Sequence, residues 1–487
     1  MIIAYDLGTG GLKASLYAID GKLQSFVFAP YQTYCEGSRI MEQNPQDWWG
    51  AIVSATGELL QKTGVEASEV EAVSISGHSL GVVPVGADGC LLTTRTPIWS
   101  DKRAFLQAEK FFKNFDYKTW YERTGGGFPP ECYSLFKVLW YRDNEPELFA
   151  KASVFLGTKD YCNFKFTGKI ATDHSYASGC GAYNLASREY DSEILKVSGL
   201  KENPFAPILS SDTVVGCISD EASRQTGLGT HTKVICGGVD NSCMALGSMG
   251  TESGRVYTSL GSSAWIALTS DSPVLDFQYK PYVFAHLIEN MYVSSTCIFS
   301  SGTSLEWLRK MLCPNFDYKQ LDALAEESPL GANGVLFNPS LAGGSMIEKS
   351  PDICGAFTGL KLSTTRADML RAGLEGIALN LNFALEVLRG VGTSVNKMLL
   401  TGGGAKSKLW TRIFADVYNL EILTSSITQE AASLGAAALA MKALGSISSY
   451  REIDKLHCIE NRTLPEQPST LAYKPIYERF RALAKSL

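Results

Sequence analysis

Short apolar runs that end in glycine-rich turns alternate along the chain with stretches in which apolar residues recur every three or four positions. The runs predict strands and the stretches predict helices, an alternation typical of an α/β protein. In the first half, strands are expected at residues 2–7, 12–18 and 70–76, and helices at 45–63 and 133–143. Glycines between the first two strands predict a tight turn, so these strands should form a hairpin.

A second series of strands and glycine-rich turns begins near residue 232. Its expected strands cover residues 234–236, 255–260 and 397–400, and its expected helices begin at 242 and cover 366–390 and 430–444. The last of these helices is rich in alanine, so it tolerates close packing. Strand-and-turn modules near residues 6 and 260 predict a duplicated α/β architecture, with one domain over residues 1–248 and another over 249–487.

Composition supports a large folded protein and disfavours several other classes. The 487 residues suffice for two domains or more, 45% of them are hydrophobic and only 19% are charged. The net charge of −6 gives no reason to expect a nucleic acid or an anionic membrane as partner. Twelve cysteines without a Cys-x-x-Cys pair argue for reduced thiols rather than a zinc site. No run of eighteen apolar residues occurs and Met1–Asp6 turns acidic early, so we expect a soluble cytoplasmic protein.

Three glycine-rich turns that follow apolar strands could bind phosphate. Backbone N–H groups in such turns approach an anion without hindrance from a Cβ atom. The turns are Gly8–Gly11, Gly261–Ser263 and Gly402–Gly404, and each could equally be a structural turn when considered alone. No Gly-x-x-x-x-Gly-Lys-Ser/Thr loop is present, and Lys13 occupies the third glycine position of a dinucleotide fingerprint. Ordinary P-loop and dinucleotide-binding folds are therefore disfavoured.

Two aspartates stand where predicted strands end beside glycine turns. Asp6 could hold Mg²⁺ next to transferred phosphates, or it could cap the turn by accepting a backbone N–H. Asp240 could accept a proton from an alcohol that attacks ATP, whereas its plainer role would be an Asx-turn. The next residue, Asn241, could hydrogen-bond a substrate hydroxyl. The residue types alone leave these alternatives open.

Two further segments carry side chains that suit a sugar. Trp99 offers an aromatic face and Asp101 a carboxylate, and sugars pack their C–H faces on rings while their hydroxyls bond charged groups. A surface ion pair between Asp101 and Arg103 is the competing interpretation. His78 follows a predicted strand and could titrate near neutral pH, although a lone histidine is more often structural.

Seven ordered segments together resemble the FGGY carbohydrate kinases, and most closely their xylulokinase-like members, over nearly the whole chain. These segments are Asp6-Leu-Gly-Thr-Gly10, Trp48-Trp49, Trp99-Ser-Asp101, Lys159-Asp160-Tyr161, Gly237-Gly-Val-Asp-Asn241, Ser259-Leu-Gly-Ser-Ser263 and Thr401-Gly-Gly-Gly-Ala405. The resemblance implies an α/β fold of two actin-like, ribonuclease-H-like ATPase domains that flank a deep cleft. It implies ATP and Mg²⁺ as cofactors and a small-molecule sugar as substrate, and it leaves a homodimer open.

The resemblance also implies roles for particular residues. Asp240 matches the catalytic base, and Asp6 matches the acidic residue near the metal. The implied ATP- and phosphate-binding residues are Gly8, Thr9, Gly10, Lys13, Gly261, Ser262, Ser263, Gly402, Gly403, Gly404 and Ala405. The implied substrate-binding residues are His78, Ser79, Leu80, Trp99, Asp101, Asp240 and Asn241.

The chain departs from the xylulokinase pattern in two places. Where that pattern reads Gly-Gln-Met-His-Gly, this chain has Gly77-His-Ser-Leu-Gly81, so the hydrogen-bonding histidine becomes Leu80. A lost hydrogen bond typically costs about 0.5–1.5 kcal/mol, which re-ranks sugars without changing the reaction. The second departure is Gly343–Pro351, which lacks the arginine of a Gly-Glu-Arg-x-Pro pattern and puts the role of that loop in doubt.

The first interpretation is ATP-dependent phosphorylation of D-xylulose to D-xylulose 5-phosphate. L-fuculose, L-ribulose, gluconate, glycerol and a linear diol stay open as other acceptors. An actin-like scaffold also builds chaperone ATPases and sugar-responsive regulators, but Asp240 and Asn241 argue against a protein without an alcohol base. A catalytically silent relative is the third interpretation.

Overall fold

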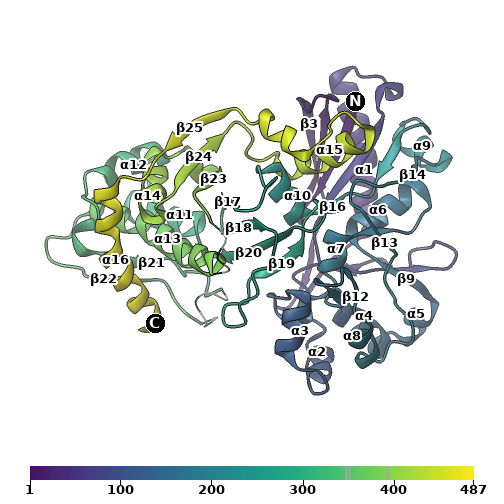
Figure 1. Ribbon diagram of the computed structural model, residues 1–487, viewed down its shortest axis with the longest axis horizontal. Helices are drawn as coiled ribbons and strands as arrows, with labels where there is room; N and C mark the ends of the chain where they lie inside the picture. Colours follow the sequence, from purple (N-terminus) through teal and green to yellow (C-terminus); the bar gives the residue numbers. More distant parts are fainter. Residues whose placement is uncertain (346–347, 349, 351, 391, 393, 487) are drawn as a thin grey trace. The chain divides into compact units, whose positions relative to one another are not determined.

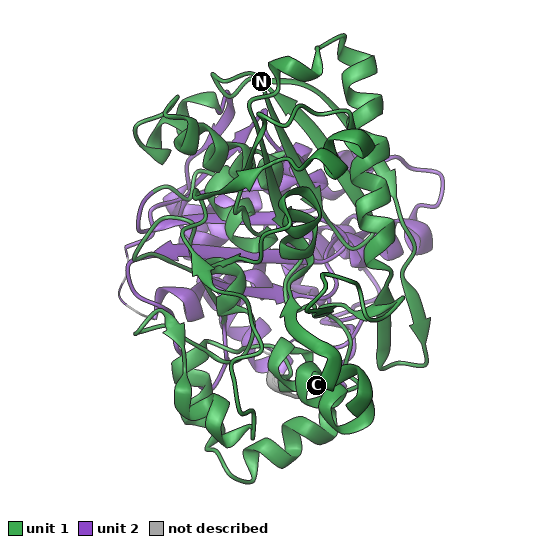
Figure 2. Ribbon diagram, turned by 90° about the vertical axis from the view of Figure 1, so that its right-hand side faces the viewer, with its two compact units in different colours: residues 1–251, 282–293, 430–456 green, residues 252–281, 294–429, 457–487 purple. Residues whose placement is uncertain are grey.

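The computed structural model describes residues 1–345, 348, 350, 352–390, 392 and 394–486. The departure at Gly343–Pro351 therefore falls partly outside the described residues, at positions 346, 347, 349 and 351. The chain forms two compact units, and each is assembled from more than one segment (Figure 2). Unit 1 contains residues 1–251, 282–293 and 430–456, and unit 2 contains residues 252–281, 294–429 and 457–487.

A mixed seven-stranded sheet forms the centre of unit 1, in the order β14-β15-β6-β1-β2-β3, with β16 also paired to β6. Its strands are β1 (Ile2–Leu7), β2 (Gly11–Tyr17), β3 (Leu23–Pro30), β6 (Ala72–Gly77), β14 (Val214–Cys217), β15 (Lys233–Ile235) and β16 (Gly238–Val239). β1 and β2 are antiparallel, which confirms the predicted hairpin, while β6 and β16 run parallel to one another and β6 runs parallel to β1. The turn after β1, the end of β6 and the end of β16 consequently lie at one edge of the sheet.

Helices of unit 1 cover this sheet or build a smaller lobe beside it (Figure 1). They are α1 (Pro45–Thr63), α2 (Phe105–Phe112), α3 (Tyr117–Thr124), α4 (Ser134–Asn144), α5 (Pro146–Lys151), α6 (Thr158–Thr167), α7 (His174–Ser178), α8 (Ser192–Val197), α9 (Asp220–Thr226), α10 (Asp240–Gly247) and α15 (Ala431–Leu444). Shorter strands pair outside the main sheet: β4 (Tyr34–Glu36), β5 (Ile40–Gln43), β7 (Val83–Gly86), β8 (Thr96–Pro97), β9 (Ala152–Leu156), β10 (Thr172–Asp173), β11 (Tyr183–Asn184), β12 (Glu189–Tyr190) and β13 (Ile208–Leu209). The predicted helix over 45–63 is confirmed to the residue, because Asn44 caps its start and Gly64 adopts a left-handed conformation at its end.

The alanine-rich helix α15 packs in unit 1 although it lies far along the chain. In Figure 1 it lies in yellow beside the purple strands, and it contacts β1, β6 and α10. Its approach to α10 is too close for side chains at two positions. A Cβ on Gly247 would lie 1.8 Å from the carbonyl oxygen of Ala431, and one on Gly435 would lie 2.1 Å from that of Cys243. The small residues thus hold α10, which carries Asp240, close against α15.

Unit 2 repeats the strand pattern of unit 1, with strands in the order β20-β18-β17-β23-β24-β25. Its elements are β17 (Arg255–Leu260), β18 (Ala264–Ser270), β20 (Tyr292–Ile298, which continues from unit 1), α11 (Gly302–Leu312), α12 (Tyr318–Glu326), β21 (Leu336–Asn338), β22 (Ala356–Thr358), α13 (Arg366–Arg389), β23 (Lys397–Gly402), α14 (Lys408–Tyr418), β24 (Glu421–Ser425), β25 (Ile459–Thr463) and α16 (Gln467–Ser486). β17 pairs antiparallel with β18 and parallel with β23, as β1 does with β2 and β6. The predicted duplicated α/β architecture is confirmed.

The core of unit 2 is built around α13, most of whose residues are buried. A capping box between Thr365 and Asp368 begins this helix and satisfies its first backbone N–H groups. Among the described helices of both units, none is long and apolar enough to cross a membrane.

Candidate active site

Asp6 and Asp240 lie at the same edge of the sheet in unit 1. Asp6 is the penultimate residue of β1, and Asp240 is the first residue of α10, directly after β16. Both strands run parallel to β6, where Ser76 stands opposite Asp6 and Gly77 opposite Val239. The Oγ of Ser76 donates to Oδ1 of Asp6 at 2.9 Å, and the backbone N–H of Asn241 donates to Oδ1 of Asp240 at 2.8 Å.

Burial raises the proton affinity of both carboxyl groups at this edge. Burial raises the pKa of Asp240 to about 7, and the negative charge of Asp6 adds to the effect. Burial also raises the pKa of Asp6, against the lowering effects of the Ser76 hydrogen bond and the Lys13 charge. A carboxylate with a pKa near the working pH is suited to general-base catalysis. This edge therefore has the chemistry expected of a site that deprotonates an alcohol.

The possible metal ligands at this edge suit a magnesium ion that binds together with phosphate. They suit less well a metal ion that is held by protein side chains alone. No group of three or more His, Cys, Asp or Glu side chains within the described ranges is placed to hold a metal. Mg²⁺ is usually bound through one or two carboxylates together with phosphate oxygens and waters. Asp6, whose charged form burial makes costly, offers such an oxygen ligand.

The turn after β1 is tied to a side chain from the predicted sugar-binding segment. Gly8 donates to the carbonyl of Gly11 at 3.1 Å and closes the hairpin, while Thr9 and Gly10 are exposed. The indole N–H of Trp99 donates to Oγ1 of Thr9 at 3.0 Å. Lys13, opposite Asp6 on β2, is partly exposed. The residues predicted for phosphate and for sugar thus meet at one turn.

The segment His78–Leu80 continues from β6 at the same edge and is buried. Neither imidazole nitrogen of His78 has a hydrogen-bond partner among the described residues, and the ring packs edge-to-face on Trp48 with centroids 5.5 Å apart. Burial lowers the pKa of His78 to about 3, so the ring is neutral at physiological pH. A buried, neutral and unpartnered imidazole is free to donate to or accept from a ligand hydroxyl.

Leu80 adopts a left-handed backbone conformation, with φ of 61°. The buried ammonium of Lys137 holds this strained residue, because its Nζ donates to the carbonyls of Leu80 at 2.9 Å and Ile98 at 2.6 Å. Ser79 is also buried. The side chain of Leu80 offers only apolar contact at the position where the family pattern has a hydrogen-bonding histidine.

Asp101 is fully buried, so the ion pair with Arg103 is not the surface patch that the sequence allowed. Arg103 donates to it from Nε and Nη2, each at 2.9 Å, and the backbone N–H groups of Met41 and Arg103 donate at 2.8 and 3.0 Å. These donors occupy both carboxylate oxygens. Direct binding of the substrate by Asp101 stays a prediction, as it does for Asn241, which is half-buried.

The two glycine turns of unit 2 lie side by side at the ends of paired parallel strands. Leu260 of β17 stands opposite Gly402 of β23. Gly402 requires a left-handed φ of 87°, and a Cβ there would lie 2.4 Å from the carbonyl oxygen of Leu260. The chain then forms a short 3₁₀ helix, Gly403–Lys406, which contains Gly404 and Ala405. Gly261–Ser263 is exposed and joins β17 to β18.

These turns border a cavity of about 970 Å³ that lies wholly within unit 2. Residues of β17, α11, α12 and α14 line it: Leu260, Gly261, Ser262, Gly302, Thr303, Leu305, Glu306, Trp307, Lys310, Tyr318, Lys319, Asp322, Gly403, Gly404, Lys406, Ser407 and Trp410. Trp307 and Tyr318 remain 42% and 53% exposed, so their rings are available to a ligand. The size and the mixture of aromatic, cationic and backbone groups suit a nucleotide.

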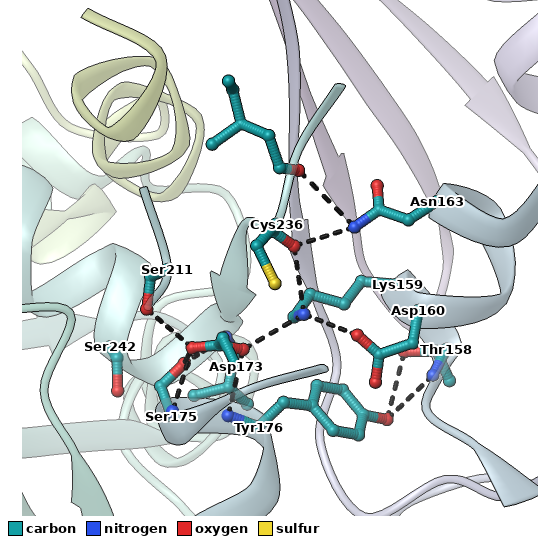
Figure 3. Close-up of polar contacts among 12 residues, drawn as sticks. Thr158, Lys159, Asp160, Asn163, Asp173, Ser175, Tyr176, Ser211, Cys236 and Ser242 are labelled. Carbon is teal, nitrogen blue, oxygen red and sulfur yellow. Dashed lines mark hydrogen bonds and ion pairs between the residues drawn. The ribbon is translucent and has the colours of Figure 1, made fainter. Parts of the chain in front are cut away.

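Sequence reasoning missed two groups of residues. The first is the wall of this cavity from α11 and α12, for which no helix was expected. The second is the buried cluster of Lys159, Asp160 and Asp173 (Figure 3). The only sequence signal for the cluster was the segment Lys159-Asp160-Tyr161, which carried no assigned role.

Comparison with known proteins agrees with this organisation along the whole chain. A curated xylulose kinase of Bacillus subtilis is 30% identical over 482 residues, covering 99% of this chain and 96% of the relative. A gluconokinase of Bacillus licheniformis is 27% identical over 497 residues, covering 100% of this chain and 96% of the relative. The crystal structure of a ligand-bound xylulose kinase from Lactobacillus acidophilus superposes with a TM-score of 0.91 at 26% identity, covering 100% of this chain and 98% of that one.

Family models lead to the same result. The N-terminal domain of the FGGY family of carbohydrate kinases matches residues 1–247, and the C-terminal domain of that family matches residues 256–444. The two matches contain the aspartates of unit 1 and the glycine turns of both units. The chain therefore belongs to the FGGY family of carbohydrate kinases, and it is a sugar kinase with the two-domain actin-like fold of its structural relatives.

Proposed function

We propose that the chain transfers the γ-phosphoryl group of ATP to a sugar hydroxyl and that Asp240 accepts the proton of that hydroxyl. The observation that carries this proposal is the place of Asp240 on the first turn of α10, at the sheet edge that also holds Asp6; burial there, together with the charge of Asp6, raises the pKa of Asp240 to about 7. Such a carboxylate is ionised above neutral pH and remains basic enough to take a proton while the new O–P bond forms.

The glycine turns are assigned to the nucleotide. Backbone N–H groups of residues 8–10 and 261–263 would hydrogen-bond phosphate oxygens, and Lys13 would add a positive charge next to the first turn. Gly402–Ala405 would border the adenosine, with Trp307 and Tyr318 offering aromatic faces to the base. The cavity in unit 2 supports this assignment by its volume and by its exposed rings.

Asp6 is assigned to Mg²⁺ bound together with ATP. The ion, when bound, offsets negative charge on the transferred phosphoryl group. Asp6 would supply an oxygen ligand to it, directly or through water. The positive charge would also favour the ionised form of Asp240, which is the form that accepts a proton.

D-xylulose is the first proposed acceptor, supported by curated relatives named xylulose kinases at 25–30% identity. The gluconokinase relatives keep gluconate among the alternatives, with L-fuculose, L-ribulose and glycerol. His78 and Ser79 could hydrogen-bond a sugar hydroxyl, whereas Leu80 could not. The preferred sugar is therefore expected either to have no hydroxyl at the position that Leu80 faces, or to bind without a hydrogen bond to that hydroxyl.

The experiment that tests the proposal is a screen of ADP release over ketoses, polyols and sugar acids, each with and without MgCl₂. A sugar-dependent, magnesium-dependent release above the rate without sugar is expected for at least one ketose or sugar acid. Product analysis by mass spectrometry should then show the sugar 80 Da heavier by one phosphoryl group. Failure of every acceptor to stimulate ADP release would contradict the proposal.

Three further assignments remain proposals. The boundary between residues 248 and 249 is supported by family matches that end at 247 and begin at 256. A cytoplasmic location agrees with the metabolite substrate. A homodimer can be tested by light scattering of the purified chain.

A further inference from the structure

We propose that the buried cluster around Lys159 and Asp173 is a positioning device that holds two segments of the active site in register. One arm fixes the backbone that carries Asp240, and the other fixes the segment that carries His78. This inference rests on the proposed function of Asp240 as the base. Residues of the cluster are positioning residues, because they act through the backbone of other residues.

Lys159 is the centre of the cluster and is fully buried (Figure 3). Its Nζ donates to Oδ1 of Asp160 at 2.6 Å, to Oδ1 of Asp173 at 3.0 Å and to the carbonyl of Cys236 at 3.1 Å. The third of these bonds reaches the chain just before β16. Burial alone would lower the pKa of Lys159, but the two carboxylates raise it well above its ordinary value, so the ammonium is charged.

The first arm runs from Asp173 through Ser175 to the residue before Asp240. Ser175 donates from Oγ to Oδ2 of Asp173 at 2.5 Å and accepts the backbone N–H of Val239 at 2.9 Å. Ser211 also donates to Oδ2 of Asp173, at 2.7 Å (Figure 3). The hydroxyl of Ser175 differs from that of Ser211 in one respect, since it also holds the backbone of β16.

The segment held in this way has no spare room. Gly237 has a left-handed φ of 78°, and a Cβ there would lie 2.2 Å from the carbonyl oxygen of Ile75. A Cβ on Gly238 would lie 2.3 Å from Cδ2 of Leu287 and 3.2 Å from Oγ of Ser175. β16 is therefore tightly packed between β6 and the cluster. Because no free space surrounds it, a change at Ser175 should shift the backbone of β16 and with it Asp240.

The second arm starts at the residue before Lys159. Thr158 donates from Oγ1 to the carbonyl of His78 at 2.8 Å, and the hydroxyl of Tyr176 donates to the same carbonyl at 3.1 Å. The backbone N–H of Thr158 in turn donates to the hydroxyl of Tyr176 at 2.9 Å. A Cβ on Gly77 would lie 2.8 Å from Cβ of Lys159, so β6 also ends against the cluster. The first residues of α6 and α7 thus support both segments.

The geometry gives the two arms different kinetic consequences. Loss of the first arm displaces the base, and a displacement of about 1 Å costs on the order of 10²-fold in rate. Loss of the second arm displaces residues that meet the sugar, so sugar affinity and sugar choice should change more than the rate at saturation. If the cluster only stabilised the fold, its loss would lower the rate at saturation and the sugar affinity together, in proportion to the lost stability.

Ser175→Ala and Ser211→Ala form a matched pair that tests the first arm. Both remove a hydroxyl from Oδ2 of Asp173, and only Ser175→Ala removes the bond to Val239. We expect kcat for the best sugar to fall at least about tenfold in Ser175→Ala and less than about threefold in Ser211→Ala, with the KM for ATP unchanged in both. Equal kcat values in the two variants, or loss of ATP binding in Ser175→Ala through misfolding, would overturn the positioning inference.

Thr158→Val and Thr158→Ser test the second arm. The valine has nearly the same shape and removes one of the two hydroxyl donors to the carbonyl of His78, whereas serine keeps it. Thr158→Val should raise the KM for the sugar at least about fivefold and change the ranking of sugars. Thr158→Ser should keep the KM and the ranking of the wild type. An unchanged KM and ranking in Thr158→Val would contradict the second arm.

Asp240→Asn, measured in the same series, separates this inference from the proposed function. Turnover retained in Asp240→Asn would contradict the base assignment and with it the inference. An inactive Asp240→Asn together with indistinguishable serine variants would contradict the positioning inference alone.

Discussion

Replacement of Asp240 by asparagine is expected to stabilise the folded chain at alkaline pH while it removes activity. The folded protein holds the pKa of this carboxyl at about 7, compared with an ordinary value of 3.8, because burial and the charge of Asp6 penalise ionisation. At pH 8 the carboxylate is therefore more stable in the unfolded chain. Asparagine has nearly the same shape and no charge, so this penalty disappears in the variant.

The size and sign of the effect follow from linkage between protonation and folding. A raised carboxyl pKa destabilises the native state progressively as pH rises from about 4 to 7, with a maximum of about 4 kcal/mol above pH 7. Asp240 keeps partial contact with solvent, so we expect Asp240→Asn to gain about 1–3 kcal/mol at pH 8. At pH 4 Asp240 is protonated in the folded chain and about half ionised in the unfolded chain, so the gain should fall below about 1 kcal/mol.

The assay is urea unfolding of both proteins at pH 4 and pH 8, followed by tryptophan fluorescence and circular dichroism, since the two units need not unfold together. Asp20→Asn is the matched control, because Asp20 is exposed and hydrogen bonds from Lys22 lower its pKa. That control should show no gain at pH 8. A midpoint for Asp240→Asn that is equal to, or below, that of the wild type at pH 8 would refute the reasoning about this carboxyl.

Three further predictions concern catalysis and binding. The value of kcat/KM should fall as pH drops below about 7, because protonation of Asp240 removes the base, and a flat profile from pH 5 to 8 would count against this origin. Restoration of Gln-Met-His at positions 78–80 should change the ranking of kcat/KM over a sugar panel, and an unaltered ranking would show that these residues do not face the sugar. Trp307→Ala should weaken ATP binding about tenfold, measured by calorimetry, while the KM for the sugar stays the same. An unchanged ATP affinity would mean that the adenine ring does not pack on Trp307.

Local signals predicted the parts of the fold that depend on neighbouring residues. The hairpin of β1 and β2 follows from two apolar runs around a glycine turn, and the helix over 45–63 follows from its cap, its proline and its spacing. The same signals placed Asp6 near the end of the first strand, just before the turn of that hairpin. Asp240 was expected at a strand end, and the structure places it on the first turn of α10 directly after the two-residue strand β16.

Contacts between distant segments were not predictable from the same signals. The alanine content of residues 430–444 indicated close packing, but it could not show that α15 joins unit 1 against α10. Lys159 and Asp173 meet only because α6 and the end of β10 fold together. Lys159 stands in a segment that matches the family, but nothing in that segment pointed to Asp173 as its partner. The contact of Asp101 with the backbone N–H of Met41, on β5, was likewise not predictable, whereas the sequence did offer its ion pair with Arg103.

The wall that α11 and α12 contribute to the cavity of unit 2 also depends on long-range packing. Gly302, at the start of α11, donates to the carbonyl of Gly261 at 2.9 Å, and a Cβ at this glycine would lie 2.5 Å from the same oxygen. This close approach brings Trp307 toward the turn at 261–263. A glycine followed by an ordinary amphipathic helix gives no sign of it in the sequence.

The measurement that tests the central claim most directly is sugar-dependent ADP release by Asp240→Asn with the best acceptor, together with ATP affinity of the same protein. Asp240 as general base predicts a loss of roughly 10²–10⁴-fold in kcat with ATP affinity within about twofold of the wild type. Turnover at the wild-type rate would contradict the claim that Asp240 takes the proton.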